Sequence, residues 1–240
     1  MEKHRADKPD SPKRGFGPGR SRLRQAQGAR RHGLFNLWYH YSSRLRRDVV
    51  LKSDVEFDHF CWLEGEPNVL RYELEPAPVM VAIGEESRRT QFDAFVEFRR
   101  GRPQLREIKT DEANLSTREI VQREAQERAA TTAGFEYMRI TREDLAKHVQ
   151  LIRNWRCALA YLAACRELVL EPHCAQLLDI LQVQGRSTFE LALRQTDPAL
   201  RPIYLAALFR CLQEARLGSD LDAKPLSAAS QVWPVEVGHD

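Results

Sequence analysis

Three polar residues, Asp93, Glu107 and Lys109, have the types and the spacing needed to hydrolyse a phosphodiester bond. Two carboxylates held close together repel each other unless a divalent cation lies between them, and such hard oxygen ligands suit Mg²⁺ or Mn²⁺. A neighbouring ammonium group can hold or deprotonate an attacking water, while the metal stabilises charge on the phosphate. The residue types therefore predict metal-dependent chemistry, provided that the fold brings the three side chains together.

The segments that carry these residues predict a β-hairpin. Residues 91–98 alternate between polar and apolar side chains in the manner of a strand, and residues 104–109 form a second, shorter strand. Side chains two positions apart share one face of a strand, so Glu107 and Lys109 should point the same way.

The turn between the two strands predicts their register. A three-residue loop with Gly101 in the left-handed conformation would pair Phe98 with Arg102. Counting back from that pair places Asp93 directly opposite Glu107, at the separation that a shared cation requires.

A hairpin with a solvated polar face would show a similar pattern, because 30% of the chain is charged. Two observations favour a site. Only 7 of the 37 basic residues are lysine, and lysine, unlike arginine, can lose its proton when it is desolvated. A second acid-x-Lys triplet at residues 222–224 lies in a polar stretch without an apolar strand, which indicates a loop.

Composition restricts the class of protein. The 240 residues allow one large or two modest domains, and no apolar run is long enough to cross a membrane. The N-terminal segment lacks the apolar region of a secretory signal. The five cysteines include no Cys-x-x-Cys pair, so we expect reduced thiols, no zinc site and a cytoplasmic protein.

Charge and composition divide the chain into three predicted regions. Residues 1–48 contain 13 basic and 4 acidic residues, a balance of +9, so the other 192 residues carry −6. We expect a basic, flexible arm at 1–43, an α/β domain at 44–165 and a helical domain with a polar tail at 166–240. The arm could attract phosphate backbones or serve only as a solubilising tail.

The middle region predicts a mixed sheet flanked by helices. Ser53 is a suitable N-cap for a helix over 52–63, with Glu56 in its first turn. An acid there either favours the helix dipole or supplies a third carboxylate to the metal site. The remaining expected elements are strands at 68–75, 78–83 and 135–140, a helix over 116–132 and a helix starting at Thr141.

From Cys174 onwards the pattern predicts helices only. Three short helices precede a polar segment at 219–232, an order typical of a winged-helix or related helix-turn-helix unit. The third helix is not notably basic, which leaves docking to a protein and reading of DNA both open.

Several segments, in their order and spacing from about Leu45 to Trp233, resemble the TnsA-type transposon-end endonucleases of the PD-(D/E)xK restriction-endonuclease-like superfamily. The chain departs from the pattern in having Phe92 where a proline is usual and Glu107 where glutamine is frequent. The segments that carry the resemblance are Ser43–Arg47, Lys52-Ser53-x-x-Glu56, Asn68–Pro76, Phe92-Asp93, Glu107-Ile108-Lys109, Arg153–Trp155 and the winged-helix-like tail.

The resemblance implies a nuclease-like catalytic domain with a restriction-endonuclease-like fold. Its catalytic set would be Glu56, Asp93, Glu107 and Lys109. Mg²⁺, or Mn²⁺ in its place, would be bound by Asp93, Glu107 and the backbone carbonyl of Ile108, with Glu56 as a further ligand.

The resemblance also implies partners. Double-stranded DNA at transposon ends would be bound with the help of Arg44, Arg46 and Arg47. A DDE-type transposase would cut and join the 3′ ends while this chain hydrolyses the 5′-end strands, and the C-terminal unit would dock on an ATP-dependent regulator, without membrane involvement. The implied location is the bacterial cytoplasm, in association with the nucleoid.

Two alternatives remain at this point. One is a stand-alone restriction or repair nuclease of the same fold, and the other is a non-catalytic DNA-binding adaptor in which the acidic hairpin is only a surface.

Overall fold

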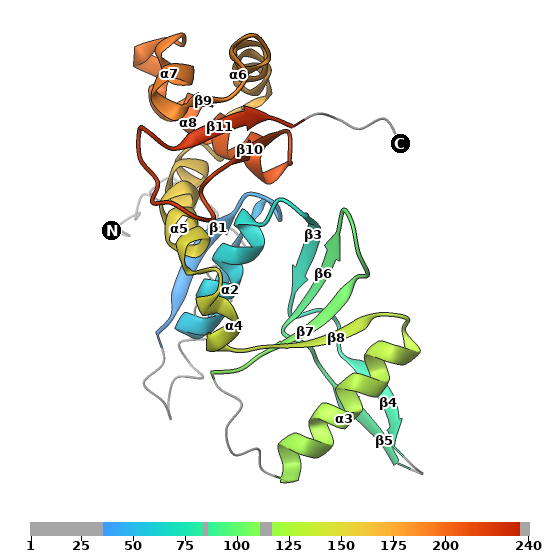
Figure 1. Cartoon of the computed structure of the whole chain (residues 1–240). Helices are drawn as coiled ribbons and strands as arrows, with labels where there is room; N and C mark the ends of the chain where they lie inside the picture. The colour runs from blue at the N-terminus through green and yellow to red at the C-terminus, as the bar shows by residue number, and fades with distance from the viewer. Residues whose placement is uncertain (1–35, 84–85, 111–116, 236–240) are drawn as a thin grey trace, which may run out of the picture.

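The strands and helices expected in the middle region occur in the predicted order in the structure, a computed structural model that describes residues 36–83, 86–110 and 117–235 (Figure 1). Strands at Arg47–Leu51 and Glu86–Thr90 are additional to those predicted. Four strands form the central sheet, in the order β3-β6-β7-β8. They are β3 (Val69–Leu74), β6 (Ala94–Phe98), β7 (Gln104–Ile108) and β8 (Glu136–Ile140). The first three are antiparallel and β7 pairs with β8 in parallel, so the predicted mixed sheet is confirmed.

Helices cover both faces of this sheet (Figure 1). On one face lie α2 (Asp54–Gly65), α4 (Arg142–Ala146) and α5 (Val149–Ala164). On the other lie α3 (Thr117–Thr132) and a separate hairpin of β4 (Val79–Ile83) and β5 (Glu86–Thr90). The alternation of the strands explains this division: Ala94 and Val96 join the larger core with α2, whereas Phe95 and Leu105 join the smaller core with α3.

Local capping signals account for the ends of several helices. The Ser53 side chain accepts from the Glu56 N–H and begins α2, as predicted. Thr141 and Asp144 form a capping box at the start of α4. The cap expected for α3 at residue 116 lies outside the described residues.

The predicted arm is shorter than expected. Residues Trp38–Ser42, assigned to the arm at 1–43, form strand β1, which pairs with β2 (Arg47–Leu51) in an antiparallel hairpin. The Trp38 ring stacks on Phe57 of α2 with ring centroids 4.2 Å apart. This aromatic contact and the ladder with β2 order a segment whose composition alone resembles that of the tail before it; residues 1–35 lie outside the described residues.

The C-terminal region combines helices with strands, so the prediction of helices only was wrong. Its strands form a three-stranded antiparallel sheet in the order β10-β11-β9. The elements are α6 (Glu171–Gln184), β9 (Ser187–Thr188), α7 (Phe189–Arg194), the 3-10 helix η2 (Pro198–Leu200), α8 (Arg201–Gln213), β10 (Leu217–Ser219) and β11 (Gln231–Pro234). The acid-x-Lys triplet at 222–224 lies in the loop between β10 and β11, as predicted.

Helix α5 joins the two halves of the chain. The buried Asn154 amide donates to the carbonyls of Leu221 and Lys224, both at 2.7 Å, and thereby holds the β10–β11 loop. Trp155, 1% exposed, packs against Gly65 of α2 so closely that a Cβ there would lie 2.3 Å from the indole. One core cluster consequently runs from β2 to β11 across the predicted boundary at residue 165.

Within the described ranges, no helix combines the length and the apolar character that crossing a bilayer would require.

We predict that Gly65→Ala destabilises the protein by about 1–3 kcal/mol, because the added methyl group would overlap the Trp155 ring. Urea unfolding measures this loss. Replacing Trp155 by leucine in the same chain removes the obstacle, so the double variant should lose less than the sum of the two single losses. Strict additivity would contradict the packing argument.

Candidate functional site

The register of the central hairpin agrees with the prediction. Ala94 pairs with Arg106 at the end of the β6–β7 ladder, which makes Asp93 and Glu107 the next opposed positions. The Asp93 N–H donates to the Arg106 carbonyl at 2.9 Å, so the two chains remain paired there. The loop differs, because the ladder ends at Val96 and the expected Phe98–Arg102 pair is not among the pairs of β6 with β7.

Glu107 and Lys109 point the same way, as predicted. The Lys109 ammonium lies 2.7 Å from Glu107 Oε1, and the two side chains are 37% and 7% exposed. The second carboxylate oxygen of Glu107, Oε2, is buried and accepts no hydrogen bond from any described residue. A buried carboxylate oxygen without a donor is costly, and a bound cation would remove that cost.

Asp93 carries the clearest electrostatic evidence. Its Oδ2 accepts a hydrogen bond from the Ile108 N–H at 2.7 Å. Burial, with smaller contributions from the charges of Glu107 and Glu56, raises the pKa of Asp93 to about 6 against the lowering effect of the Ile108 N–H and Lys109. Carboxylates from two strands and a helix therefore act on one another at this edge of the sheet.

Glu56 reaches the same edge from the first turn of α2. Its Oε2 accepts from the Lys52 N–H at 2.8 Å, which fixes the carboxylate beside the helix N-terminus. Burial raises the pKa of Glu56, as does the charge of Glu75, and Lys52 opposes the shift. The dipole interpretation and the third-carboxylate interpretation are thus compatible, because the carboxylate acts on Asp93 from its place in the first turn.

Lys52 and Glu75 belong to this edge, and no role for them was predicted from the sequence. The Lys52 ammonium lies 2.5 Å from Glu75 Oε1. The hydrogen bond to Glu75 raises the pKa of Lys52, and the charges of Glu56 and Asp93 add to it. The Glu75 N–H donates to the Asp93 carbonyl at 2.8 Å, with Glu75 in the left-handed region at φ +50°. The signal was available: lysine is rare in this chain, and Lys52 stands directly before the cap of α2.

Alternation along β7 places Arg106 on the face of the sheet opposite to Glu107. Arg106, between Leu105 and Glu107, points toward α2, where its guanidinium lies 4.7 Å from the Trp62 ring centroid and 3.2 Å from His59 Nε2. Burial lowers the pKa of Arg106 to about 10 and holds the pKa of His59 well below its ordinary value. A shift of one position in register would exchange Arg106 with Glu107 and destroy the site.

The residues present fit a divalent cation in chemistry. Carboxylates from Asp93, Glu107 and Glu56 are hard oxygen donors, and one of them has the orphan oxygen described above. In the described conformation no three His, Cys, Asp or Glu side chains of residues 36–83, 86–110 and 117–235 are close enough together to hold a metal ion. Of these three acids, Glu107 is in an ion pair with Lys109, and the ion pair of Lys52 is with the neighbouring Glu75.

Polar side chains of α3 and β8 border the site. These side chains line a shallow pocket together with Glu107 and Lys109. They are Gln122, Arg123, Gln126, Tyr137 and Arg139. The Tyr137 hydroxyl donates to Gln126 Oε1 at 3.2 Å, and burial raises the pKa of Tyr137, so the phenol stays protonated at neutral pH.

The three arginines expected to contact DNA have different surroundings. Arg44 is half-buried and donates to the carbonyls of Val69 and Glu66 at 2.7 and 3.0 Å. Burial lowers its pKa, and these contacts give it a structural role between α2 and β3. Arg46 is exposed in the β1–β2 turn, and Arg47 begins β2.

We predict that Asp93→Asn stabilises the metal-free protein above pH 6. The pKa of Asp93 is raised from 3.8 to about 6, so ionisation of this carboxyl destabilises the folded protein. The loss of stability is absent below pH 3.8, grows between pH 3.8 and pH 6, and is complete above pH 6. Asparagine keeps an oxygen for the Ile108 N–H without the charge. Urea unfolding in EDTA should show a gain of about 1–3 kcal/mol at pH 8 that disappears near pH 4. A gain that is equal at both pH values would show that charge is not its cause.

No protein-family model matches this chain, and no curated protein matches it. What the site does is therefore inferred from its own side chains and their surroundings.

Proposed function

We propose that the chain is a metal-dependent DNA endonuclease. The observation that carries this proposal is the convergence of Asp93, Glu107 and Lys109 on one face of the central hairpin, with Glu56 acting on Asp93 from α2. When ionised, the four carboxylates of Glu56, Glu75, Asp93 and Glu107 and the two ammonium groups leave a charge of −2, which matches one divalent cation.

The architecture supports the restriction-endonuclease-like fold. A mixed four-stranded sheet carries the acidic hairpin in its centre, with α2 on one face and α3 on the other. The C-terminal order of helix, strand, two helices and two strands, with β11 between β9 and β10, supports a winged-helix unit.

Each residue has a distinct chemical task in this proposal. Asp93, Glu107 and the Ile108 carbonyl, with Glu56, would hold Mg²⁺ or Mn²⁺, which supplies charge stabilisation at the phosphate when it is bound. Lys109 lies beside Glu107 and is partly open to solvent, so its ammonium can hold a water, and only its neutral amine form could accept a proton from that water. The Ile108 N–H fixes the orientation of the Asp93 carboxylate.

The biological setting that fits the family resemblance is transposition. The chain would hydrolyse the 5′-end strands at transposon ends, together with a DDE-type transposase and an ATP-dependent regulator, in the bacterial cytoplasm at the nucleoid. The winged-helix-like unit offers a surface for those proteins or for DNA. A stand-alone restriction or repair nuclease and a non-catalytic DNA-binding adaptor are the alternatives that the experiments below separate.

We predict that Asp93→Ala abolishes Mn²⁺ binding in calorimetry, because it removes a carboxylate that is opposed to Glu107. Lys109→Ala should keep metal binding and lower cleavage of plasmid DNA by about 10²–10⁴-fold, the usual contribution of an acid–base group. Lys224→Ala, in the loop triplet, is the matched control and should change neither quantity. Equal Mn²⁺ binding by wild type and Asp93→Ala would favour the adaptor.

We predict weak cleavage by the isolated chain and strong stimulation by a DDE-type transposase on DNA carrying transposon ends. Such dependence follows if the active site is completed only in the assembly. The rate of strand cleavage with and without the transposase measures it. Efficient cutting of purified DNA by the chain alone would instead favour the stand-alone nuclease.

A further inference from the structure

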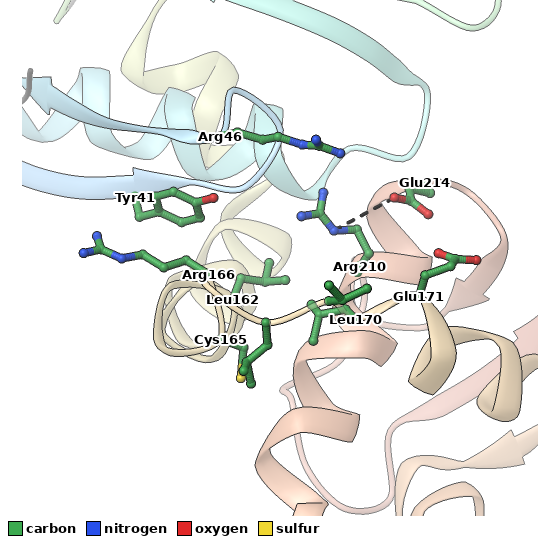
Figure 2. A pocket seen from close by; sticks show the side chains of 11 residues that line it. Tyr41, Arg46, Leu162, Cys165, Arg166, Leu170, Glu171, Arg210 and Glu214 are labelled. Atoms are coloured by element: carbon green, nitrogen blue, oxygen red, sulfur yellow. Dashed lines mark ion pairs between the residues drawn. The ribbon is translucent and has the colours of Figure 1, made fainter. Parts of the chain in front are cut away.

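A pocket of about 370 Å³ lies at the junction of the two halves of the chain (Figure 2). The β1–β2 hairpin contributes Tyr41 and Arg46, and α8 contributes Arg210. The floor is apolar and comes from Leu162 of α5 and from the connection between α5 and α6, including Leu170. The pocket is therefore built by both domains and is separate from the catalytic edge.

Arg46 occupies a backbone conformation that does not suit it. Its φ is +51°, in the left-handed region. A glycine adopts this conformation without strain, whereas a residue with a Cβ is destabilised there. Its exposed guanidinium has no hydrogen bond or ion pair with any part of the chain that the structure describes. Neither stability nor an internal contact explains an arginine at this position. Backbone strain that no contact within the protein offsets indicates that the residue has a function.

The guanidinium groups of Arg46 and Arg210 reach toward each other inside the pocket (Figure 2). Arg210 also donates to the Ser43 carbonyl at 3.3 Å, which holds it in place beside the turn. Two like charges facing each other repel, and an anion between them converts this repulsion into attraction.

The acids around the pocket supply that anion only in part. Arg216 lies 2.9 Å from a carboxylate oxygen of Glu171 and 3.3 Å from one of Glu214. Glu214 also forms an ion pair with Arg210, drawn in Figure 2, but at 3.9 Å this contact is too long for a hydrogen bond. Arg166, the third arginine of the lining, lies 3.3 Å from an Asp48 oxygen. Arg46 thus has no acidic partner among the described residues and Arg210 has only a long ion pair, so these two cations can take a ligand.

We propose that this pocket binds a backbone phosphate of duplex DNA between Arg46 and Arg210. The proposal rests on the endonuclease function and adds a second point at which the duplex is held. Guanidinium groups present paired N–H donors that match phosphate oxygens, and the aliphatic floor partly desolvates the contact and strengthens it. A phosphate carries no sequence information, so the pocket positions DNA and does not read bases.

The test uses the full chain and a fluorescent duplex in EDTA, which prevents cleavage. Arg46→Gly removes the guanidinium and relieves the strained backbone, so the fold should be retained, as thermal unfolding verifies. We expect duplex affinity to fall about tenfold or more, with the slope of log affinity against log salt reduced by about one. Arg210→Gln should behave similarly. Arg71→Gln, an exposed arginine of β3 paired with Glu97, is the control and should keep the wild-type slope.

Other outcomes identify other ligands. Unchanged duplex affinity and slope in Arg46→Gly would overturn the proposal, whatever the chain cleaves. Stabilisation of the wild type by inorganic phosphate with no effect on duplex binding would assign the pocket to a free phosphate. Binding of a glutamate-rich peptide that is lost in Arg46→Gly while DNA binding persists would assign it to a protein partner. Arg46-dependent duplex binding by a chain that never cleaves would keep the pocket and reject the nuclease.

Discussion

A single buried carboxylate, Glu64 near the end of α2, holds together the segments on which the rest of the structure depends. Its Oε1 accepts from Ser42 and from the Tyr72 hydroxyl, the latter at 2.6 Å, and its Oε2 accepts from the Gln213 amide at 2.6 Å. The Ser43 hydroxyl completes the network by donating to Gln213 Oε1 at 2.7 Å. These donors come from the β1–β2 hairpin, from β3 and from α8. A buried charge is tolerated only when it is fully hydrogen-bonded, so the removal of any one segment would leave the others with an unsatisfied carboxylate.

The network fixes both proposed sites because α2 is rigid. Glu56 stands eight residues before Glu64, about 12 Å along the same helix, so the end that is held by the network sets the position of the end that reaches the acidic edge. The charge of Glu64 also favours the buried guanidinium of Arg44, which ties the end of α2 to the start of β3. On the other side, the turn that begins at Ser43 carries Arg46 over the junction pocket. The hydrogen-bond network of Glu64 thereby positions both Glu56 at the acidic edge and Arg46 at the junction pocket.

Local patterns in the sequence were sufficient to predict the hairpin but not the network. The opposition of Asp93 and Glu107 follows from strand alternation and from the short distance in sequence between the two strands, although the predicted pairing at the turn did not form. Glu64 could not be distinguished from a solvated helix residue, because its donors are up to 149 positions away. For the same reason Arg44 was interpreted as part of a basic DNA-contacting run, although Glu64 and two carbonyls hold it inside. The strand Ser187–Thr188 was missed because two residues have no periodicity, and it exists only through its pairing with β11.

The continuity of the core decides how the two proposed sites can act together. Trp155 of α5 touches Gly65 of α2 and lies 6.0 Å, ring centroid to ring centroid, from Phe209 of α8. Asn154, beside it, fixes the β10–β11 loop, so the same helix binds both halves through apolar and polar contacts. Rotation of one half against the other would have to expose this shared core, which is costly because large buried side chains contribute several kcal/mol each. A duplex held at the junction pocket would therefore meet the proposed catalytic edge at a fixed offset, set by the length of α2 and not by a flexible linker.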